Sequence, residues 1–264
     1  GMSVTQLLGG WRTRLPTYAS TYRGQEGNAG LCTPEAYVDF AEHCHALGYR
    51  AFKIKVGFGT EADLDTLRPV ARELKTGERL MVDVNQGWDL RTACATVPKL
   101  AEFGLQWIEE PLMADRPLAE WTQVAAAAPT QLAGGENLRG ASLFQEAIDS
   151  GLFGVIQPDA AKWGGHSGCL PVARAALAAG RTYCPHFLGG AIGLMHSLHL
   201  LAAVRGPGLL EVDANPNPLR KGLLGDLMAA REGTVSLPGG QGLGLEPDLK
   251  PLINLRSLHI ERRA

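Results

Sequence analysis

The sequence has little that would tie it to disulfides, membranes or nucleic acid. The five cysteines are Cys32, Cys44, Cys94, Cys169 and Cys184. Their odd number and the lack of a C-x-x-C pair are typical of a reduced, cytoplasmic compartment. No run approaches the ~20 apolar residues of a membrane span, and the start lacks the features of a signal peptide. Lys and Arg number 25 against 27 Asp and Glu, so no basic excess favours nucleic acid or an anionic membrane.

Several catalytic motifs are also missing. No G-x-G-x-x-G follows the first expected strand, and we find no P-loop, Ser-His-Asp nucleophile elbow or zinc-type spacing of Cys and His. The 33 glycines and 16 prolines are scattered as turn residues and form no low-complexity segment. What is left is a globular chain of 264 residues, long enough for one large α/β barrel or two ordinary domains.

What the sequence does contain is a regular alternation of short β-branched runs and longer Ala/Leu-rich amphipathic stretches. This alternation predicts parallel strands joined by helices. Eight strands favour an α/β fold of the modified TIM type, a (β/α)7β barrel, over an open doubly wound sheet. We expect the barrel in residues 1–213 and a C-terminal extension in 214–264. The expected strands are 17–22, 51–56, 80–84, 106–110, 131–134, 154–157, 181–184 and 208–212, with helices near 35–47, 61–75, 90–103, 117–128, 141–150, 167–179 and 191–204.

Ionisable residues mark the ends of the expected strands from the second onward. They recur roughly every 25 residues, about the length of one strand, one helix and two loops. The carboxyl ends of barrel strands meet at one mouth, where active sites are found. Seven ionisable groups there are costly unless they are paired or bind something, so we expect a functional site built from Lys55, Asp83, Glu109, Glu136, Asp159, His186 and Glu211.

Three of these residues, Asp83, Glu109 and Glu136, are carboxylates on consecutive strands. At a common mouth they would repel one another, and a hard divalent cation would relieve that repulsion. Mg²⁺ prefers oxygen ligands and keeps positions open for water or substrate. One such acid alone could merely cap the next helix, but three in register favour a Mg²⁺ site.

Two further groups could carry protons. Lys53 and Lys55 share one face of their strand, and we expect each ammonium group to depress the other's pKa, which would supply a neutral amine base. The alternative is an exposed edge pair. Asp159 could orient His186 as a second acid or base, whereas a lone His in a turn is usually a polar loop residue. Glu211 is either a protonated donor to a substrate carboxylate or a strand-end acid.

Other polar residues near these positions are assigned more simply. Glu110 follows Glu109, so strand alternation would turn it to the other face, and we expect it to be structural. Lys162 lies three residues after Asp159 and could enter the site from the loop, with its role open. Four histidines in expected helices are interpreted as structural: His43, His45, His196 and His199. Thr33 and Asp89 fit helix N-caps.

Together these residues resemble the mandelate racemase/muconate lactonizing enzyme family, within the mandelate racemase subgroup of the enolase superfamily. The likeness runs from about Leu7 to Leu249. Each motif alone is weak, but their shared order is highly specific. The motifs are Leu7-Leu8-Gly9-Gly10, Lys53-x-Lys55, Val82-Asp83-Val84-Asn85, Ile108-Glu109-Glu110-Pro111, Gly135-Glu136-Asn137, Gln157-Pro158-Asp159-Ala160-Ala161-Lys162, Pro185-His186 and Leu210-Glu211.

The resemblance implies a role for each strand-end residue. Asp83, Glu109 and Glu136 would bind Mg²⁺. Lys55, with Lys53 as its electrostatic neighbour, and His186, supported by Asp159, would be acid/base groups on opposite faces of the substrate. Glu211 would donate a hydrogen bond to the substrate carboxylate, and Asn85 would lie beside the substrate. The pairing of a Lys or His base with Mg²⁺ is a general property of this superfamily.

The implied chemistry is removal of the α-proton of a carboxylate through an enediolate. We favour dehydration of an acid sugar to a 2-keto acid, because that class is abundant in the subgroup and residues 213–220, with Asn215-Pro216-Asn217-Pro218, resemble such members. Racemisation or epimerisation of a 2-hydroxy acid would use the same residues and is the alternative.

One departure from the family concerns the N-terminal capping domain that members carry over the barrel mouth. The sequence begins just before the barrel, so we expect the cap to be missing, and the extension 214–264 packs on that cap in the family. A catalytically silent barrel or subunit is therefore a third hypothesis. The expected partners are a small-molecule carboxylate and either a second copy of the chain or a separate capping domain, with no nucleic acid or membrane.

Overall fold

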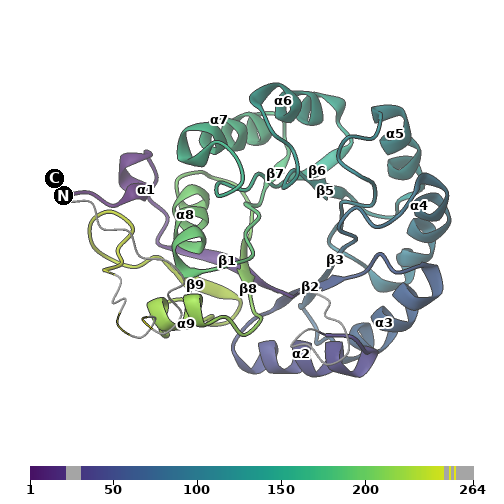
Figure 1. Cartoon of the computed structure of the whole chain (residues 1–264), viewed down its shortest axis with the longest axis horizontal. Coiled ribbons are helices and arrows are strands. Elements are labelled where there is room, and N and C mark those ends of the chain that lie inside the picture. The colour runs from purple at the N-terminus through teal and green to yellow at the C-terminus, as the bar shows by residue number, and fades with distance from the viewer. Residues whose placement is uncertain (22–30, 247–249, 251–252, 254–264) are drawn as a thin grey trace.

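A computed structural model of the chain describes residues 1–21, 31–246, 250 and 253. Strands and helices alternate around a ring, with the strands inside and the helices outside (Figure 1). The ring strands are β1 (Arg14–Ser20), β2 (Ala51–Lys55), β3 (Arg79–Asp83), β4 (Ile108–Glu109), β5 (Leu132–Gly134), β6 (Phe153–Ile156), β7 (Thr182–Tyr183) and β8 (Leu210–Asp213). The connecting helices are α2 (Pro34–Ala46), α3 (Thr60–Glu73), α4 (Leu90–Thr96) with the 3-10 helix η1 (Val97–Phe103), α5 (Leu118–Ala127), α6 (Ala141–Ser150), α7 (Gly165–Ala178) and α8 (Ala191–Ala202).

The sheet follows the order β7-β6-β5-β4-β3-β2-β1-β8, and every neighbouring pair on this path is parallel. β7 and β8 form no strand ladder with each other. They nevertheless meet, since the Leu209 amide donates to the Cys184 sulfur at 3.3 Å. A Cβ on Gly208 would lie 1.9 Å from the Tyr183 carbonyl oxygen, so glycine is needed at this close approach. The expected (β/α)7β barrel is confirmed, with one seam between β7 and β8.

The strand boundaries differ by a few residues from those expected. β1 begins at Arg14 rather than at residue 17, and the expected last residue of that strand, Tyr22, lies outside the described residues. β4 is reduced to Ile108–Glu109. The expected caps are present: the Thr33 hydroxyl accepts from Ala36 N at 3.2 Å, and the Asp89 carboxylate accepts from Thr92 N at 2.7 Å.

An apolar layer fills the inside of the barrel beneath the strand ends. Its largest members are Tyr18 and Trp107, whose rings meet edge to face at 5.4 Å. Side chains of a strand alternate between its two faces, so the residues two positions further along point inward as well, and on β2 and β3 these are Lys53 and Asp83. The layer itself consists of Tyr18, Ala51, Met81, Trp107, Ala133, Val155, Cys184 and Leu209. A charged layer therefore lies directly above an apolar one.

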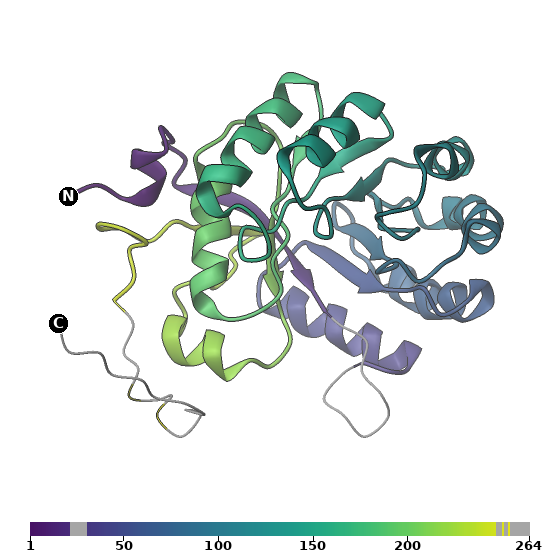
Figure 2. The same ribbon diagram turned by 45° about the horizontal axis from the view of Figure 1, so that its top comes forward.

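The segment after β8 packs beside the start of the chain. It contains α9 (Pro218–Leu224) and β9 (Thr234–Ser236), and β9 pairs antiparallel with β1. Gly242 bridges to Ser3, next to the short helix α1 (Val4–Leu7). Figure 2 shows α1 and this yellow-green segment on the same flank of the barrel. The described part of this extension thus stabilises the outer side of β1.

Two composition-based expectations can also be compared with the structure. All five cysteines lie in the described part of the chain and are free thiols. Among the described residues, no helix has both the length and the apolar character needed to cross a membrane.

Candidate active site

Lys53 is the centre of a buried charge cluster at the mouth of the barrel. Its ammonium nitrogen lies 2.6 Å from Glu109 Oε1, 2.7 Å from Glu211 Oε1 and 3.3 Å from Asp83 Oδ2. Burial alone would lower the pKa of Lys53, but Glu109 and Glu211 outweigh it and raise the pKa well above its usual value. The expectation that neighbouring cations depress this pKa was wrong, because three acids lie closer to Lys53 than that argument assumed. Lys53 is therefore held as a cation.

Asp83 lies between the two lysines of β2. Lys55 Nζ donates to Asp83 Oδ2 at 2.5 Å, and the two residues are partners in the β2–β3 register. Burial raises the pKa of Asp83, but Lys55 and Lys53 outweigh it and lower that pKa to about 2. Asn85 has a left-handed φ of 46° and folds back, so that its backbone N–H donates to Asp83 Oδ1 at 2.8 Å. Asn85 is thereby fixed beside the candidate ligand Asp83, and its place beside the substrate stays a prediction.

Glu109 is held by two neutral donors as well as by Lys53. Trp107 Nε1 donates to Glu109 Oε2 at 3.0 Å, and Gln157 Nε2 donates to the same oxygen at 2.8 Å. Burial, with a further contribution from Asp83, raises the pKa of Glu109 to about 8. Sequence reasoning did not assign this role to Trp107 or Gln157. The available signal was their spacing, since each lies two residues before a predicted site acid on the same inward face.

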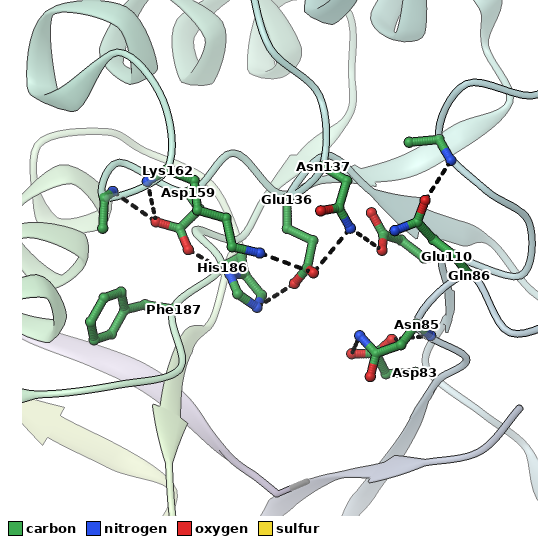
Figure 3. Close-up of polar contacts among 12 residues, drawn as sticks. Asp83, Asn85, Gln86, Glu110, Glu136, Asn137, Asp159, Lys162, His186 and Phe187 are labelled. Carbon is green, nitrogen blue, oxygen red and sulfur yellow. Dashed lines mark hydrogen bonds and ion pairs between the residues drawn. The ribbon is translucent and has the colours of Figure 1, made fainter.

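Glu136 follows β5 and gathers donors from two other loops and from its own neighbour Asn137 (Figure 3). His186 Nε2 contacts Glu136 Oε2, while Lys162 Nζ and Asn137 Nδ2 each lie 3.1 Å from Glu136 Oε1. Burial raises the pKa of Glu136, but His186 and Lys162 outweigh it, so the pKa falls well below its usual value. Lys162, whose role the sequence left open, enters the site as a partner of this carboxylate.

His186 and Asp159 form the expected pair. Nδ1 of His186 lies 2.8 Å from Asp159 Oδ2, and both side chains are buried. Burial alone would lower the pKa of His186, but Glu211, Asp159 and Glu136 raise it to about 10. With these partners the imidazole is protonated at neutral pH. It can act as an acid in this arrangement.

Glu211 lies at the seam between β7 and β8. The Phe187 amide donates to its Oε2 at 3.0 Å, and Lys53 contacts its other oxygen. Burial raises the pKa of Glu211, but Lys53 and His186 outweigh it and lower the pKa. Glu211 is therefore ionised in this arrangement, and donation of a hydrogen bond from it would first require a proton.

Glu110 lies on the opposite face of the strand from Glu109, as alternation suggested, because its Cγ is 3.9 Å from the position of a Cβ on Gly134, the neighbour of the inward-facing Ala133. β4 ends at Glu109, and Glu110 has a left-handed φ of 41° and a buried side chain. Asn137 Nδ2 donates to Glu110 Oε2 at 2.7 Å (Figure 3). Burial, with help from Glu136 and Asp83, raises the pKa of Glu110 to about 7. The structural role assigned to Glu110 stays a prediction.

The three candidate metal ligands are close enough to influence one another's pKa. Asp83 raises the pKa of Glu109, and Glu136 raises that of Asp83. Among the described residues, however, no three His, Cys, Asp or Glu side chains are arranged to hold a metal ion. Each of these carboxylates already has cationic partners. Lys55 contacts Asp83, and Lys53 contacts Glu109. Glu136 is contacted by both Lys162 and His186. The metal ligand set remains a prediction.

Four histidines outside the site make contacts elsewhere in the described part of the fold. His199 is fully buried on α8. Its Nδ1 accepts a hydrogen bond from Thr5 N at 3.2 Å and lies 2.7 Å from Thr5 Oγ1. His196 Nδ1 lies 3.0 Å from His166 Nε2. His45 contacts Glu78 on the outside of the barrel. These contacts agree with the interpretation of His45, His196 and His199 as structural.

Comparison with known proteins identifies the family. The family model described as Enolase C-terminal domain-like matches residues 36–251. The chain belongs to this family. Its relatives are enzymes, and the resemblance found in the motifs is confirmed. One curated relative, D-galactarolactone cycloisomerase of Agrobacterium fabrum, is 32% identical over 97% of this chain and 69% of that protein. Others are dehydratases, chloromuconate cycloisomerases and an epimerase.

Solved structures give the same result. A mandelate racemase/muconate lactonizing enzyme from Bordetella bronchiseptica aligns with a TM-score of 0.86 and 48% identity, over 95% of this chain and 67% of that one. An L-talarate dehydratase from Polaromonas, in complex with Mg and L-glucarate, aligns with a TM-score of 0.80 and 27% identity, over 96% and 66%. The chain thus spans about two thirds of the length of these relatives.

Proposed function

We propose that this protein removes the α-proton of a carboxylate substrate with the help of Mg²⁺, and that it dehydrates an acid sugar to a 2-keto acid. The observation that carries the proposal is the meeting, at one mouth, of three strand-end acids with Lys55 on one side and the Asp159–His186 pair on the other. Related dehydratases, one of them in complex with Mg and an acid sugar, support this choice of reaction.

The donor chemistry of the site fits Mg²⁺. Asp83, Glu109 and Glu136 offer carboxylate oxygens, the ligands that this ion prefers. The crowding of these acids also fits, because burial and Asp83 raise the pKa of Glu109 to about 8, and a divalent cation would relieve that repulsion. When bound, the ion would stabilise the negative charge that develops on the substrate carboxylate as the proton leaves.

The protein's own residues would move the protons. Lys55 would take the α-proton or return it, and Lys53, fixed as a cation by Glu109 and Glu211, would keep the local field positive. His186, oriented by Asp159, would give its proton to the leaving β-hydroxyl, so that the carbon–oxygen bond breaks with loss of water. Asn85 would contact the substrate beside Asp83.

The same groups support racemisation or epimerisation as a second candidate. Lys55 ends β2 and the His186 loop follows β7, so they approach from different sides of the ring (Figure 1). One would remove the proton and the other would return it. Incubation in D₂O separates the two reactions: deuterium at the α-carbon without a keto product indicates racemisation, and a 2-keto acid indicates dehydration.

About a third of each relative's length lies outside the part that aligns with this chain. We propose that residues 214–264 contact a capping domain, supplied by the same polypeptide or by a separate one, and that the barrel alone is silent or weakly active. The activity of this chain should therefore be compared with the activity of the longest protein that its coding sequence specifies.

The test is a screen of aldonic and aldaric acids with and without Mg²⁺, scored for 2-keto acid. We expect one or a few substrates, with activity lost in Lys55→Ala and in His186→Ala. Lys99→Ala is the control, since Lys99 only pairs with Glu61 on the surface. No turnover of any library member, either by this chain or by the longest protein that its coding sequence specifies, each with confirmed bound Mg²⁺, would refute dehydration. A rearranged lactone without keto acid would indicate cycloisomerisation.

A further inference from the structure

Among the described residues, Lys162 is the one lysine of the site that stands on a loop rather than on a strand (Figure 3). Its backbone is fixed by Asp159, whose Oδ1 accepts from Ala161 N at 2.7 Å and from Lys162 N at 3.2 Å. The other oxygen of Asp159 holds His186. One carboxylate therefore positions both cations that contact Glu136.

Lys162 differs from the other site lysines in exposure. Lys53 is fully buried, Lys55 nearly so, and the Lys162 side chain is 36% exposed. A buried ammonium group cannot leave its acids without a large desolvation cost, because no water is available to replace them. The Lys162 ammonium can exchange Glu136 for water at a smaller cost, since its side chain already reaches solvent and His186 still contacts the buried Glu136.

The contact made by Lys162 uses the oxygen that a metal would need. Nζ lies 3.1 Å from Glu136 Oε1, the oxygen that also accepts from Asn137. His186 contacts the second oxygen. A cation can use Glu136 fully only when at least one of these partners turns away, and the exposed Lys162 is the easier one to displace.

We propose that Lys162 is an exchangeable counter-ion of Glu136: it competes with Mg²⁺ for this carboxylate and so lowers the affinity of the site for the ion. This inference rests on the proposed function, because it assumes that Glu136 is a metal ligand. It assigns to Lys162 a positioning and tuning role. The exchange would keep Glu136 paired whether or not the ion is bound.

The experiment is a calorimetric titration of Mg²⁺ into protein cleared of divalent ions with EDTA. Lys162→Met removes the competing charge, and we expect it to bind Mg²⁺ about five-fold more tightly than the unchanged protein. Lys162→Gln should show the same tightening, and Lys162→Arg, which keeps the charge, should stay within about two-fold. Lys99→Met is the matched control, since Lys99 Nζ lies 3.1 Å from Glu61 Oε1 in an exposed ion pair.

A second readout does not depend on calorimetry. The rise in melting temperature on adding saturating Mg²⁺ should be larger for Lys162→Met and Lys162→Gln than for the unchanged protein. Equal or weaker Mg²⁺ binding by both neutral variants overturns the role of Lys162 and leaves the proposed function intact. Absence of Mg²⁺ binding by the unchanged protein overturns both.

Discussion

Lys53 and Glu109 form an ion pair of 2.6 Å in which both side chains are almost wholly buried. The pair lies above the apolar layer of the barrel. Glu211, whose Oε1 is 2.7 Å from Lys53 Nζ, joins the two residues in one cluster. Such a cluster is stable only as a unit, because removing one partner leaves the others buried without compensation.

The first prediction follows from that pair. Lys53→Met should lower the free energy of unfolding by about 3–5 kcal/mol, measured by urea denaturation at neutral pH without divalent ions. Lys99→Met, which breaks an exposed pair with Glu61, should cost less than about 1 kcal/mol. A Lys53→Met variant as stable as this control would show that the buried cluster does not depend on its cation.

A second prediction concerns Gly10, which lies against the end of α8. A Cβ at this position would lie 2.3 Å from Ala203 Cα and 2.7 Å from the Ala202 carbonyl oxygen. The backbone would have to shift, so Gly10→Ala should cost about 1–3 kcal/mol, measured by thermal or urea unfolding. Gly239→Ala is the control, because nothing lies within 4 Å of a Cβ there. Equal stability of the two variants would contradict the close approach of Gly10 to the end of α8.

A third prediction is a pH dependence due to His199. Burial, assisted by nearby His166, lowers the pKa of His199 below its usual 6.5. Below that pH the unfolded chain binds a proton that the folded chain resists, so this contribution to stability is present above pH 6.5 and is lost as the pH falls beneath it. Protonation also removes the acceptor of Thr5 N, a bond that contributes about 1 kcal/mol.

The check for His199 is a difference between two proteins, since His186 titrates in the opposite direction. The free energy of unfolding is measured at about pH 7.5 and about pH 5.5 for the unchanged protein and for His199→Gln. The unchanged protein should lose more stability between these two values than the variant does. If the two losses are the same, His199 does not resist protonation in the folded chain.

A fourth prediction separates the two tasks of Asp159. Asp159→Asn keeps an oxygen for the amides of Ala161 and Lys162 but removes the charge beside His186, so kcat should fall about 100-fold with little change in melting temperature. Asp159→Ala should lose both activity and several degrees of melting temperature. The substrate is the one identified by the acid-sugar screen. Activity of Asp159→Asn within about three-fold of the unchanged protein would exclude a catalytic contribution from this charge.

The fold and the membership of the site were predictable from local periodicity. Inward-facing residues at strand ends, such as Lys53, Asp83 and Glu109, follow from two-residue alternation and the even spacing of the βα units. The Asp159–His186 pair followed as well, because neighbouring parallel strands bring their ends together. These features depend on rules that hold along a short segment of chain.

What sequence reasoning missed depends on geometry beyond the strand ends or on the sum of many charges. Asn137 joins Glu110 to Glu136, and no periodicity indicates that contact. The pKa of Lys53 is raised rather than lowered, because the outcome depends on distances to three acids on other strands. The pKa of Glu211 is lowered in the same way, because Lys53 and His186 outweigh burial, so Glu211 is ionised.

The seam between β7 and β8 has a mechanical consequence. His186 follows one of these strands and Glu211 lies on the other, and the Phe187 amide joins the two sides through Glu211 Oε2 at 3.0 Å. Since no ladder of backbone bonds locks the strands together, the histidine loop can shift against β8 without tearing the sheet. The ring is therefore most compliant beside the group that would hand a proton to the substrate, while the lysine-bearing strand β2 is clamped by ladders on both edges.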